Sequence, residues 1–423
     1  MLDTLHIGGC AMPPIHAHRP AQAISPLGRS RVTGRKARPP QATRPGWIGL
    51  ETLESRTLLA GTPFPIANAP GNELAIDAAF DGANFLVGVA QGGTAFRGEV
   101  GAQLVSPAGA RIGSLISTGR TGSPPMVAFG GDNYLLAWSD LASSPDNDIY
   151  GAILSPAGDL GNPFVINDDS GRQDIGDIAF DGTNYLVTWR SNSGNDVMAQ
   201  LVSPTGQPLG PQIPIALDQG NCTPEKPLDF TALAVAFDGT QYLAVWEARR
   251  PTGPERYDIM GAFISPVGVV SAPFQISQAS SPAWNWLSLD FDGRNYLVVW
   301  GLGTGPAILD NTPFDVYGRF VSPTGKMATG ELPIATGRAD QTTMPGIVAF
   351  TGTNYLVSWF EGSSPTNTDV YARYISPAGK MVGLAKAIGK APGFQCGGAL
   401  AIGAGKCLVI INDGNPFDAA PTT

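Results

Sequence analysis

Residues 179–189 read AFDGTNYLVTW, from Ala179 to Trp189, and variants of this phrase recur along the chain. In it, an Asp-Gly pair separates a short apolar run from an alternating run that ends in Trp. An Asp-Gly pair between two such runs predicts a tight hairpin turn, because the turn needs a positive backbone φ. The phrase therefore predicts two antiparallel strands, here called strands A and B.

Seven copies of the phrase follow one another at a spacing of about 50 residues. Counted from the residue before the turn, they stand at Phe80, Phe129, Phe180, Phe237, Phe291, Phe350 and Ile402. In the first six, strand B is followed by an acidic residue, a third strand and a Ser-Pro-X-Gly turn. Pro presets φ at the first turn position and Gly accepts a φ that other residues avoid. A short fourth strand then completes the unit, and such a period is typical of a β-propeller.

We therefore predict an all-β fold, a β-propeller of seven four-stranded blades. The repeats begin near residues 72, 121, 172, 229, 283, 342 and 395. The segment from Pro63 to Ile66 resembles the fourth strand of the repeats but precedes the first one. We expect it to be the outer strand of the last blade, which joins the two chain ends and leaves no open sheet edge. The third strand of that blade has the weakest signal, because few residues follow Ile411.

Each of five repeats ends strand B with a Trp. These residues are Trp138, Trp189, Trp246, Trp300 and Trp359. Large aromatic side chains bury the most apolar area per residue, so we expect these five to pack between neighbouring blades. They do not by themselves predict a ligand site.

Residues 1–60 differ in composition from residues 61–423. They carry eight basic residues, three acidic residues and all three His of the chain (His6, His16 and His18). They lack strand or helix periodicity, so we predict a basic, Pro-rich segment that is disordered or removed. Residues 61–423, the predicted propeller, hold 18 basic and 32 acidic residues, a net charge of −14. That balance argues against a nucleic-acid partner, whose phosphates require clustered Lys and Arg.

The first segment ends with GLETLESRTLLAG over residues 49–61. This stretch resembles the Leu-Glu-x-Arg-x-Leu-Leu-Ala segment near the start of many planctomycetal secreted or cell-surface proteins. The matching residues are Leu53, Glu54, Arg56, Leu58, Leu59 and Ala60. The repeats also resemble those of uncharacterised secreted proteins of such bacteria. The resemblance implies export to the cell surface or beyond, with processing or anchoring near Ala60.

The residues alone support export less strongly. A positive stretch before a small-residue site fits a targeting peptide, but the apolar run is short for one. A disordered basic tail on a cytoplasmic protein is the alternative. No run approaches the roughly 20 apolar residues of a transmembrane helix.

Four cysteines occur, Cys10, Cys222, Cys396 and Cys407, and none has the spacing of a metal site. Cys396 and Cys407 both lie in the last blade, where a disulfide between them could form after export. The alternative is two small buried residues, because free Cys is often buried and Cys407 replaces the repeat's Tyr. Sequence does not decide connectivity.

The absence of His from residues 61–423 removes several mechanisms. Ser-His-Asp and Cys-His catalysis need an imidazole base, and catalytic zinc usually takes His ligands. We expect no metal and no cofactor. A glycosidase needs only two carboxyl groups and is not removed by this argument. Candidate carboxyl groups are Asp174, Asp177, Asp290, Glu247 and Glu361, but we found no acidic residue recurring at a fixed position of strand A.

The predicted topology places the A–B and C–D turns on one face of the propeller and the longer, variable B–C and D–A loops on the other. A rigid scaffold with its irregularity on one face usually binds there. The candidate ligand-binding residues on that face are Arg249, Arg250, Arg256, Tyr257, Trp284 and Trp286. Exposed aromatics beside Arg are frequent binding anchors. Ordinary loop residues are the alternative, and Trp286 could instead belong to strand A.

From these features we expect an exported, non-catalytic binding or scaffold module that recognises a glycan or a protein through its variable-loop face. The first alternative is a glycosidase-type enzyme with paired carboxylates at the channel mouth. Two acids from different blades converging there would favour it. The second alternative is a structural surface protein that associates with copies of itself.

Overall fold

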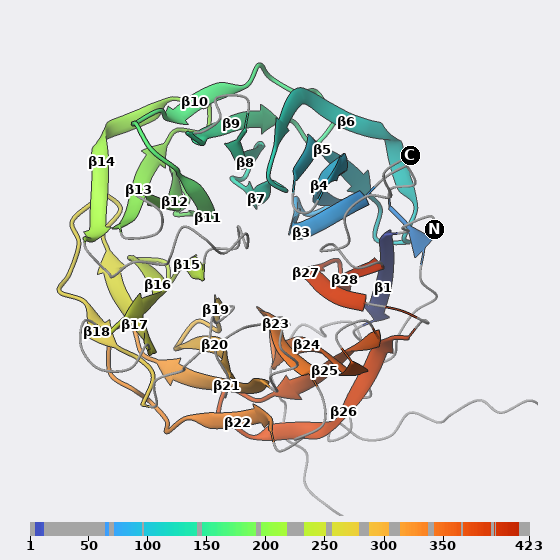
Figure 1. Cartoon of the computed structure of the whole chain (residues 1–423), viewed down its shortest axis with the longest axis vertical. Helices are drawn as coiled ribbons and strands as arrows, with labels where there is room; N and C mark the ends of the chain where they lie inside the picture. The colour runs from blue at the N-terminus through green and yellow to red at the C-terminus, as the bar shows by residue number, and fades with distance from the viewer. Residues whose placement is uncertain are drawn as a thin grey trace, which may run out of the picture.

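The computed structural model shows a chain built from strands arranged around a central axis (Figure 1). It describes residues 5–11, 64–66, 72–94, 97–141, 146–191, 196–217, 232–250, 256–278, 287–303, 314–336, 342–364, 367–390, 393 and 395–413. Every regular element in these ranges is a β-strand, so the fold is all-β. No helix that would be long and apolar enough to cross a membrane occurs in them.

Six groups of four antiparallel strands follow one another along the chain and are called units 1 to 6. Unit 1 contains β3 (Asn72–Phe80), β4 (Phe85–Thr94), β5 (Arg97–Val105) and β6 (Arg111–Gly122). Unit 2 contains β7 (Met126–Phe129), β8 (Tyr134–Asp140), β9 (Asp148–Leu154) and β10 (Phe164–Asn167). Unit 3 contains β11 (Asp174–Phe180), β12 (Tyr185–Ser191), β13 (Asp196–Val202) and β14 (Pro208–Ala216). One bridge between β6 and β8 joins units 1 and 2 into a single curled sheet.

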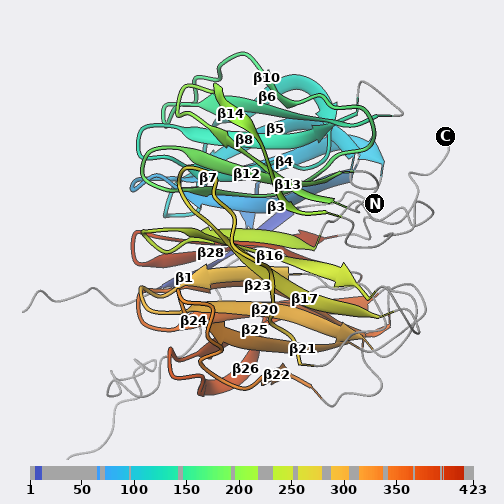
Figure 2. The same ribbon diagram turned by 90° about the vertical axis from the view of Figure 1, so that its left-hand side faces the viewer.

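The next three units form separate four-stranded sheets. Unit 4 contains β15 (Leu233–Phe237), β16 (Tyr242–Arg249), β17 (Tyr257–Ile264) and β18 (Phe274–Gln275). Unit 5 contains β19 (Leu287–Phe291), β20 (Tyr296–Gly303), β21 (Phe314–Val321) and β22 (Leu332–Ala335). Unit 6 contains β23 (Thr342–Phe350), β24 (Tyr355–Ser364), β25 (Asn367–Ile375) and β26 (Met381–Gly389). The first strand of each unit lies nearest the axis and the fourth at the rim (Figure 1). Seen from the side, the strands run between the two faces of a disc (Figure 2).

The last sheet combines both ends of the chain and is called unit 7. Its strand order is β27 (Gln395–Gly403), β28 (Lys406–Asp413), β1 (Leu5–Ala11) and β2 (Phe64–Pro65). The short strand expected at residues 63–66 is β2, and it lies at the outer edge of the sheet as expected. The third strand, however, is β1 from the N-terminal segment, which lies between β2 and β28. The sequence predicted no regular structure in residues 1–60, and the structure differs there. Residues 5–11 contain two Gly and a weak strand pattern, yet they pair with the unpaired N–H and C=O groups that β28 offers.

The predicted hairpin turn is confirmed by its geometry. In unit 3, Phe180 pairs with Tyr185 across the turn, and Gly182 has a φ of 93°. The Asp181 carboxylate accepts the backbone N–H groups of Thr183 and Asn184, each at 2.7 Å. Asp is therefore suited to this position because its side chain satisfies two turn donors, while Gly supplies the positive φ.

Neighbouring units pack face to face, and strand B supplies most of the buried surface. The five repeat Trp side chains are all buried, as expected for packing between units. A buried Tyr begins strand B in units 2 to 6, and its hydroxyl donates to a carbonyl in the A–B turn of the preceding unit. These bonds join Tyr134 to Asn84, Tyr185 to Asn133, Tyr242 to Asn184, Tyr296 to Gln241 and Tyr355 to Asn295. Phe85 and Cys407 occupy this position in units 1 and 7, so neither can make the bond.

We expect Tyr185→Phe to lower the stability of the chain. The variant removes a 2.6 Å hydrogen bond and leaves the Asn133 carbonyl without that donor. Such a loss costs about 1 kcal/mol, or a fall in Tm of roughly 1–2 °C for a chain of this size. Thermal unfolding of the variant and the wild type measures it.

Tyr371→Phe is the matched control, because this ring stacks on Trp359 and no hydrogen bond of its hydroxyl occurs among the described residues. Equal Tm values for Tyr185→Phe and Tyr371→Phe would show that the bond contributes nothing.

Candidate functional site

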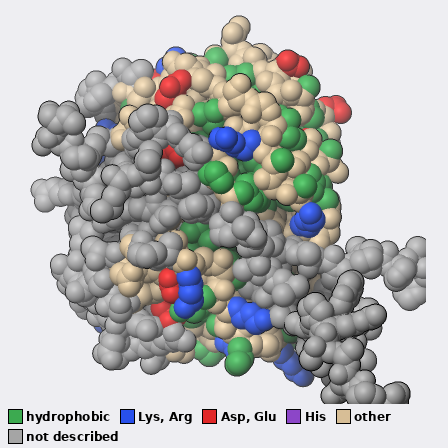
Figure 3. Space-filling model, turned by 90° about the vertical axis from the view of Figure 1, so that its right-hand side faces the viewer, with side chains coloured by type: hydrophobic (Ala, Val, Ile, Leu, Met, Phe, Trp, Pro, Cys, Tyr) green, Lys and Arg blue, Asp and Glu red, His purple; other side chains and the backbone are tan. Residues whose placement is uncertain are grey.

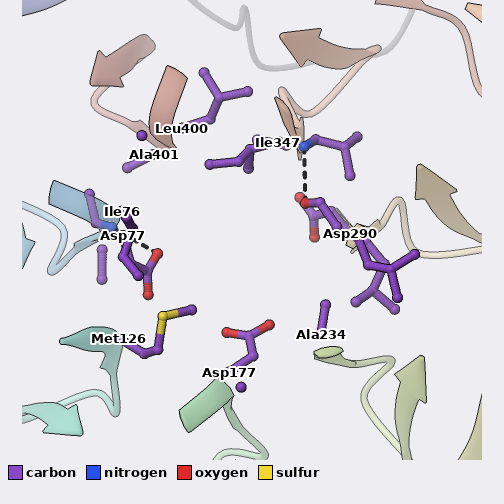
Figure 4. Close-up of a pocket in the computed structure, with 18 of the residues that line it drawn as sticks. Ile76, Asp77, Met126, Asp177, Ala234, Asp290, Ile347, Leu400 and Ala401 are labelled. Carbon is purple, nitrogen blue, oxygen red and sulfur yellow. Dashed lines mark hydrogen bonds between the residues drawn. The ribbon is translucent and has the colours of Figure 1, made fainter. Parts of the chain in front are cut away.

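The first strands of all seven units surround a pocket of about 500 Å³ on the central axis. Its wall is largely aliphatic, formed by Ala, Ile, Leu, Val and Met side chains such as Ile76, Met126, Ala234, Ile347 and Leu400 (Figure 4). In the part of the chain that the structure describes, no Lys, Arg or His lines it. Among the described residues of the wall, the ionisable groups are three carboxyl groups.

These three are Asp77 on β3, Asp177 on β11 and Asp290 on β19, and their side chains point toward the pocket (Figure 4). They come from units 1, 3 and 5. The ladders of β3 with β4 and of β11 with β12 shift register beside Asp77 and Asp177. A β-bulge of this kind turns a side chain away from the regular alternation of the strand. The bulges thus place both carboxyl groups at the axis.

Each carboxyl group also holds two units together. The Asp77 carboxylate accepts the N–H of the next residue at 2.8 Å and that of Val127 in unit 2 at 2.7 Å. The Asp177 carboxylate accepts the N–H of Ile178 at 2.7 Å and that of Val235 in unit 4 at 2.9 Å. Asp290 accepts its next residue at 2.7 Å and Phe350 in unit 6 at 2.6 Å. The bonds satisfy N–H groups that would otherwise be left unpaired at the axis.

The surroundings raise the pKa of all three carboxyl groups. Burial is the largest cause for each, since it disfavours the charged form. The negative charge of Asp177 raises the pKa of Asp77 further, and the backbone N–H bonds oppose these effects. The pKa of Asp290 rises to about 6. Asp77 and Asp177 are therefore close enough for the charge of one to affect the other across the pocket.

Of the five carboxyl groups proposed from the sequence, two line the central pocket and three do not. Asp177 and Asp290 line the pocket, whereas Asp174 forms an ion pair with Arg172 at 2.9 Å. Glu247 and Glu361 are buried near the ends of β16 and β24 and do not line the central pocket. Glu361 instead accepts the indole N–H of Trp359 at 3.2 Å.

Sequence reasoning missed Asp77, although a signal was present. Asp77 and Asp177 each stand three residues before the aromatic residue that ends strand A, Phe80 and Phe180. The statement that no acidic residue recurs at a fixed position of strand A was therefore wrong for units 1 and 3. Asp290 hid the pattern because it stands one residue before Phe291.

The proposed loop-face residues are only partly assembled. Arg250 pairs with Asp258 at 2.7 Å and binds the backbone carbonyl of Arg256, and Arg256 is exposed. Arg249 ends β16 opposite Tyr257, whose side chain is only 2% exposed. Tyr257 was expected to be an exposed anchor and is a core residue instead. Trp284 and Trp286 lie outside the described residues.

A disulfide between Cys396 and Cys407, one of the two alternatives from the sequence, does not fit the register of the last sheet. Cys396 pairs with Asn412, and Cys407 pairs with Ile402. Cys396 on β27 thus lies opposite a position five residues from Cys407 along β28, which is roughly 17 Å at the usual rise of a strand. Disulfides need Cα atoms within about 7 Å. The Cys407 side chain is buried, as in the alternative interpretation.

No group of His, Cys, Asp or Glu side chains suited to hold a metal ion occurs among the described residues. On the side of the disc that carries β1 and β6, the described basic and acidic side chains are scattered among uncharged ones (Figure 3).

No protein-family model matches the sequence, and no curated protein matches it. Among solved structures, one from an analysis of two prolyl endopeptidases has a TM-score of 0.45 at 13% identity, covering 79% of this chain and 44% of that chain. The chain thus spans less than half of that protein. A thermostable family-43 glycoside hydrolase has a TM-score of 0.39 at 12% identity, covering 76% of this chain and 96% of that chain. A Synechocystis apocarotenoid oxygenase has a TM-score of 0.42 at 13% identity, covering 73% and 70%. TM-scores this low indicate no function.

We expect the stability of the folded chain to fall as the pH rises from 5 to 8. The three carboxyl groups have higher pKa values folded than unfolded, where an Asp titrates near pH ~3.9. Between that value and the raised pKa, the folded state binds more protons, so raising the pH favours unfolding. Asp77→Asn removes one of these groups and should reduce the fall. Tm measured at pH 5 and pH 8 gives the difference.

The control is Asp132→Asn, which changes an exposed carboxyl group by the same charge. A pH dependence reduced equally by both variants would count against buried carboxyl groups as its source.

Proposed function

We propose that the chain is a non-catalytic binding module, built as a closed propeller of seven blades, that holds a small cationic ligand in its central pocket. The observation that carries the proposal is the pocket itself. Three partly buried carboxyl groups converge in an aliphatic wall that includes no described basic side chain. The volume lies in the range of about 300–1,000 Å³ that is usual for small-molecule sites.

Hydrogen bonds that link consecutive units support the closed ring. Asp77, Asp177 and Asp290 link units 1 to 2, 3 to 4 and 5 to 6. The Ser139 hydroxyl accepts the N–H of Ile175 at 2.8 Å, which links unit 2 to unit 3. Tyr296 links unit 5 back to unit 4.

The links also cross the point where the chain ends meet. Thr368 of unit 6 donates to the Gln395 carbonyl of unit 7 at 2.6 Å. Asn412 of unit 7 exchanges two hydrogen bonds with the backbone of Ala75 in unit 1, each at 3.0 Å. Every consecutive pair of the seven units is therefore linked, which supports closure.

The chemistry of the pocket favours a cation with an aliphatic body. Ionised carboxyl groups in an aliphatic wall attract a positive charge, and the wall can bury alkyl groups. An anion would find no described basic partner at this place. A sugar needs many hydrogen-bond partners for its hydroxyl groups, and the wall offers few besides the three carboxyl groups, Ser123 and Ser288.

Export and a glycan or protein partner on the variable-loop face remain parts of the proposal that rest on sequence. The structure favours the pocket over that face as the ligand site for two reasons. The Arg250 side chain is already engaged by Asp258, and Tyr257 is buried. The exposed Arg256 is the described residue best placed for a macromolecular partner.

One observation favours an enzyme as the second candidate. Asp77 and Asp177 come from different blades, and the negative charge of Asp177 raises the pKa of Asp77. A protonated acid beside a carboxylate is the pair that glycoside hydrolysis uses. Against it, both oxygen atoms of each carboxyl group already accept a backbone N–H, as described above.

We expect tetraalkylammonium ions and alkyl diamines to raise the Tm of the chain and to bind measurably by calorimetry. Their affinity should increase from pH 5 to pH 8, because the carboxyl groups ionise over this range and the cation binds the ionised form. Asp177→Asn should weaken binding at least roughly tenfold, since a hydrogen bond or ion pair to a buried charge contributes about 1.5–3 kcal/mol. Neutral alcohols of the same size test the contribution of the charge.

Asp159→Asn is the control variant, as this carboxyl group is exposed in the Ser155 turn. The same samples are assayed for sugar release from a set of polysaccharides. If the wild type releases sugar and Asp177→Asn does not, the chain is an enzyme and not a non-catalytic binding module. Neutral alcohols binding as well as the cations would overturn the cationic ligand.

A further inference from the structure

Strands β1 and β28 pair in antiparallel orientation over seven residues, from Leu5 opposite Asn412 to Ala11 opposite Lys406. In this register, Cys10 lies directly opposite Cys407. Directly opposed residues of antiparallel strands have Cα atoms about 4.5 or 5.5 Å apart, depending on their hydrogen-bonding position. Both separations fall within the range of about 4.4–6.8 Å that disulfides require. The register therefore brings these two backbone positions within disulfide distance.

Neither of the other two cysteines lies opposite Cys10 or Cys407 among the described residues. Cys396 pairs with Asn412, five residues from Cys407 along β28. Cys222 lies outside the described residues. Among the positions that the structure describes, the pairing of β1 with β28 is the one that sets two cysteines opposite each other.

Unit 7 also takes part in none of the Tyr hydroxyl bonds that join the other units. In units 2 to 6 a Tyr hydroxyl joins each unit to the one before it. Cys407 replaces that Tyr in unit 7, and Phe85 replaces it in unit 1. Unit 7 therefore lacks this bond on both of its sides. Moreover, β2 pairs only with β1, so both of the outer strands of the sheet depend on the β1–β28 pairing.

We propose that Cys10 and Cys407 form a disulfide that fastens the N-terminal strand to the last blade. In the structure the Cys407 thiol donates to the Leu408 carbonyl at 3.7 Å. A disulfide oxidant, such as oxidised glutathione, supplies the chemistry. One cysteine thiolate attacks the oxidant, and a glutathione thiolate leaves. The other cysteine thiolate then attacks the mixed disulfide and displaces the second glutathione thiolate. Two thiol protons are released, and the oxidant accepts two electrons.

The bond closes a loop that includes nearly the whole chain, from residue 10 to residue 407. A cross-link across so long a loop restricts the unfolded chain strongly. It also prevents β1 from separating from β28 while the rest of the ring is folded. The oxidised chain should therefore have a Tm several degrees above that of the reduced chain.

Peptide mapping of the full chain, 1–423, tests the proposal. The chain is incubated with oxidised glutathione, alkylated at acidic pH and digested with trypsin without reduction. Trypsin places the four cysteines in separate peptides, 1–29, 191–249, 391–406 and 407–423, because it does not cut before Pro20 or Pro227. We expect peptide 1–29 linked to 407–423, with two hydrogens lost, and only the other two peptides alkylated.

Matched variants complete the test. A variant with both Cys222→Ser and Cys396→Ser should keep the link and the difference in Tm between oxidised and reduced samples. Cys10→Ser should lose both, even if it folds with a lower Tm. A link between 391–406 and 407–423, a link from 1–29 to 191–249, or four alkylated cysteines in the oxidised wild type would each overturn the proposal.

Discussion

No unit of this chain can bury its own strand B, and the rest of the structure depends on that constraint. In β12, every side chain from Tyr185 to Arg190 is buried, although successive residues of a strand point to opposite faces. Tyr185 packs into a cluster with unit 2, and Leu186 packs into a cluster with unit 4. A unit is therefore stable only between two neighbours, as in other repeat architectures. The first and last units can meet this need only by packing against each other.

The same constraint explains the chemistry at the axis. The innermost strands approach each other there, and each needs partners for backbone N–H groups that its own sheet does not satisfy. Asp177 provides such a partner for Val235 in the next unit. A carboxyl group that serves this purpose loses part of its contact with water, and this desolvation raises its pKa. The acidic pocket is thus a product of how the units are held together, and ligand binding in it would use groups that the fold already requires.

Sequence alone predicted much of the fold because the turns and strand B carry local signals. The Asp-Gly pair at Asp181 and the Trp at the end of strand B depend on backbone conformation and apolar area, and both recur in the chain. The third strand of the last unit could not be predicted, because residues 5–11 carry little strand character and pair only with an edge that forms elsewhere. The pocket was predicted only in part. Asp77 and Asp177 reach the axis beside bulges, and the bulge beside Asp77 has no clear sequence signal.

The three bridging carboxyl groups divide the units into pairs, and seven is an odd number. Units 1 and 2, 3 and 4, and 5 and 6 each share one Asp, which leaves unit 7 as the remainder. An odd number of units cannot be divided into pairs, so one unit shares no such Asp. Here that unit also carries both chain ends. The place where the two chain ends meet therefore depends on the hydrogen bonds of Thr368 and Asn412 instead of on a shared carboxyl group.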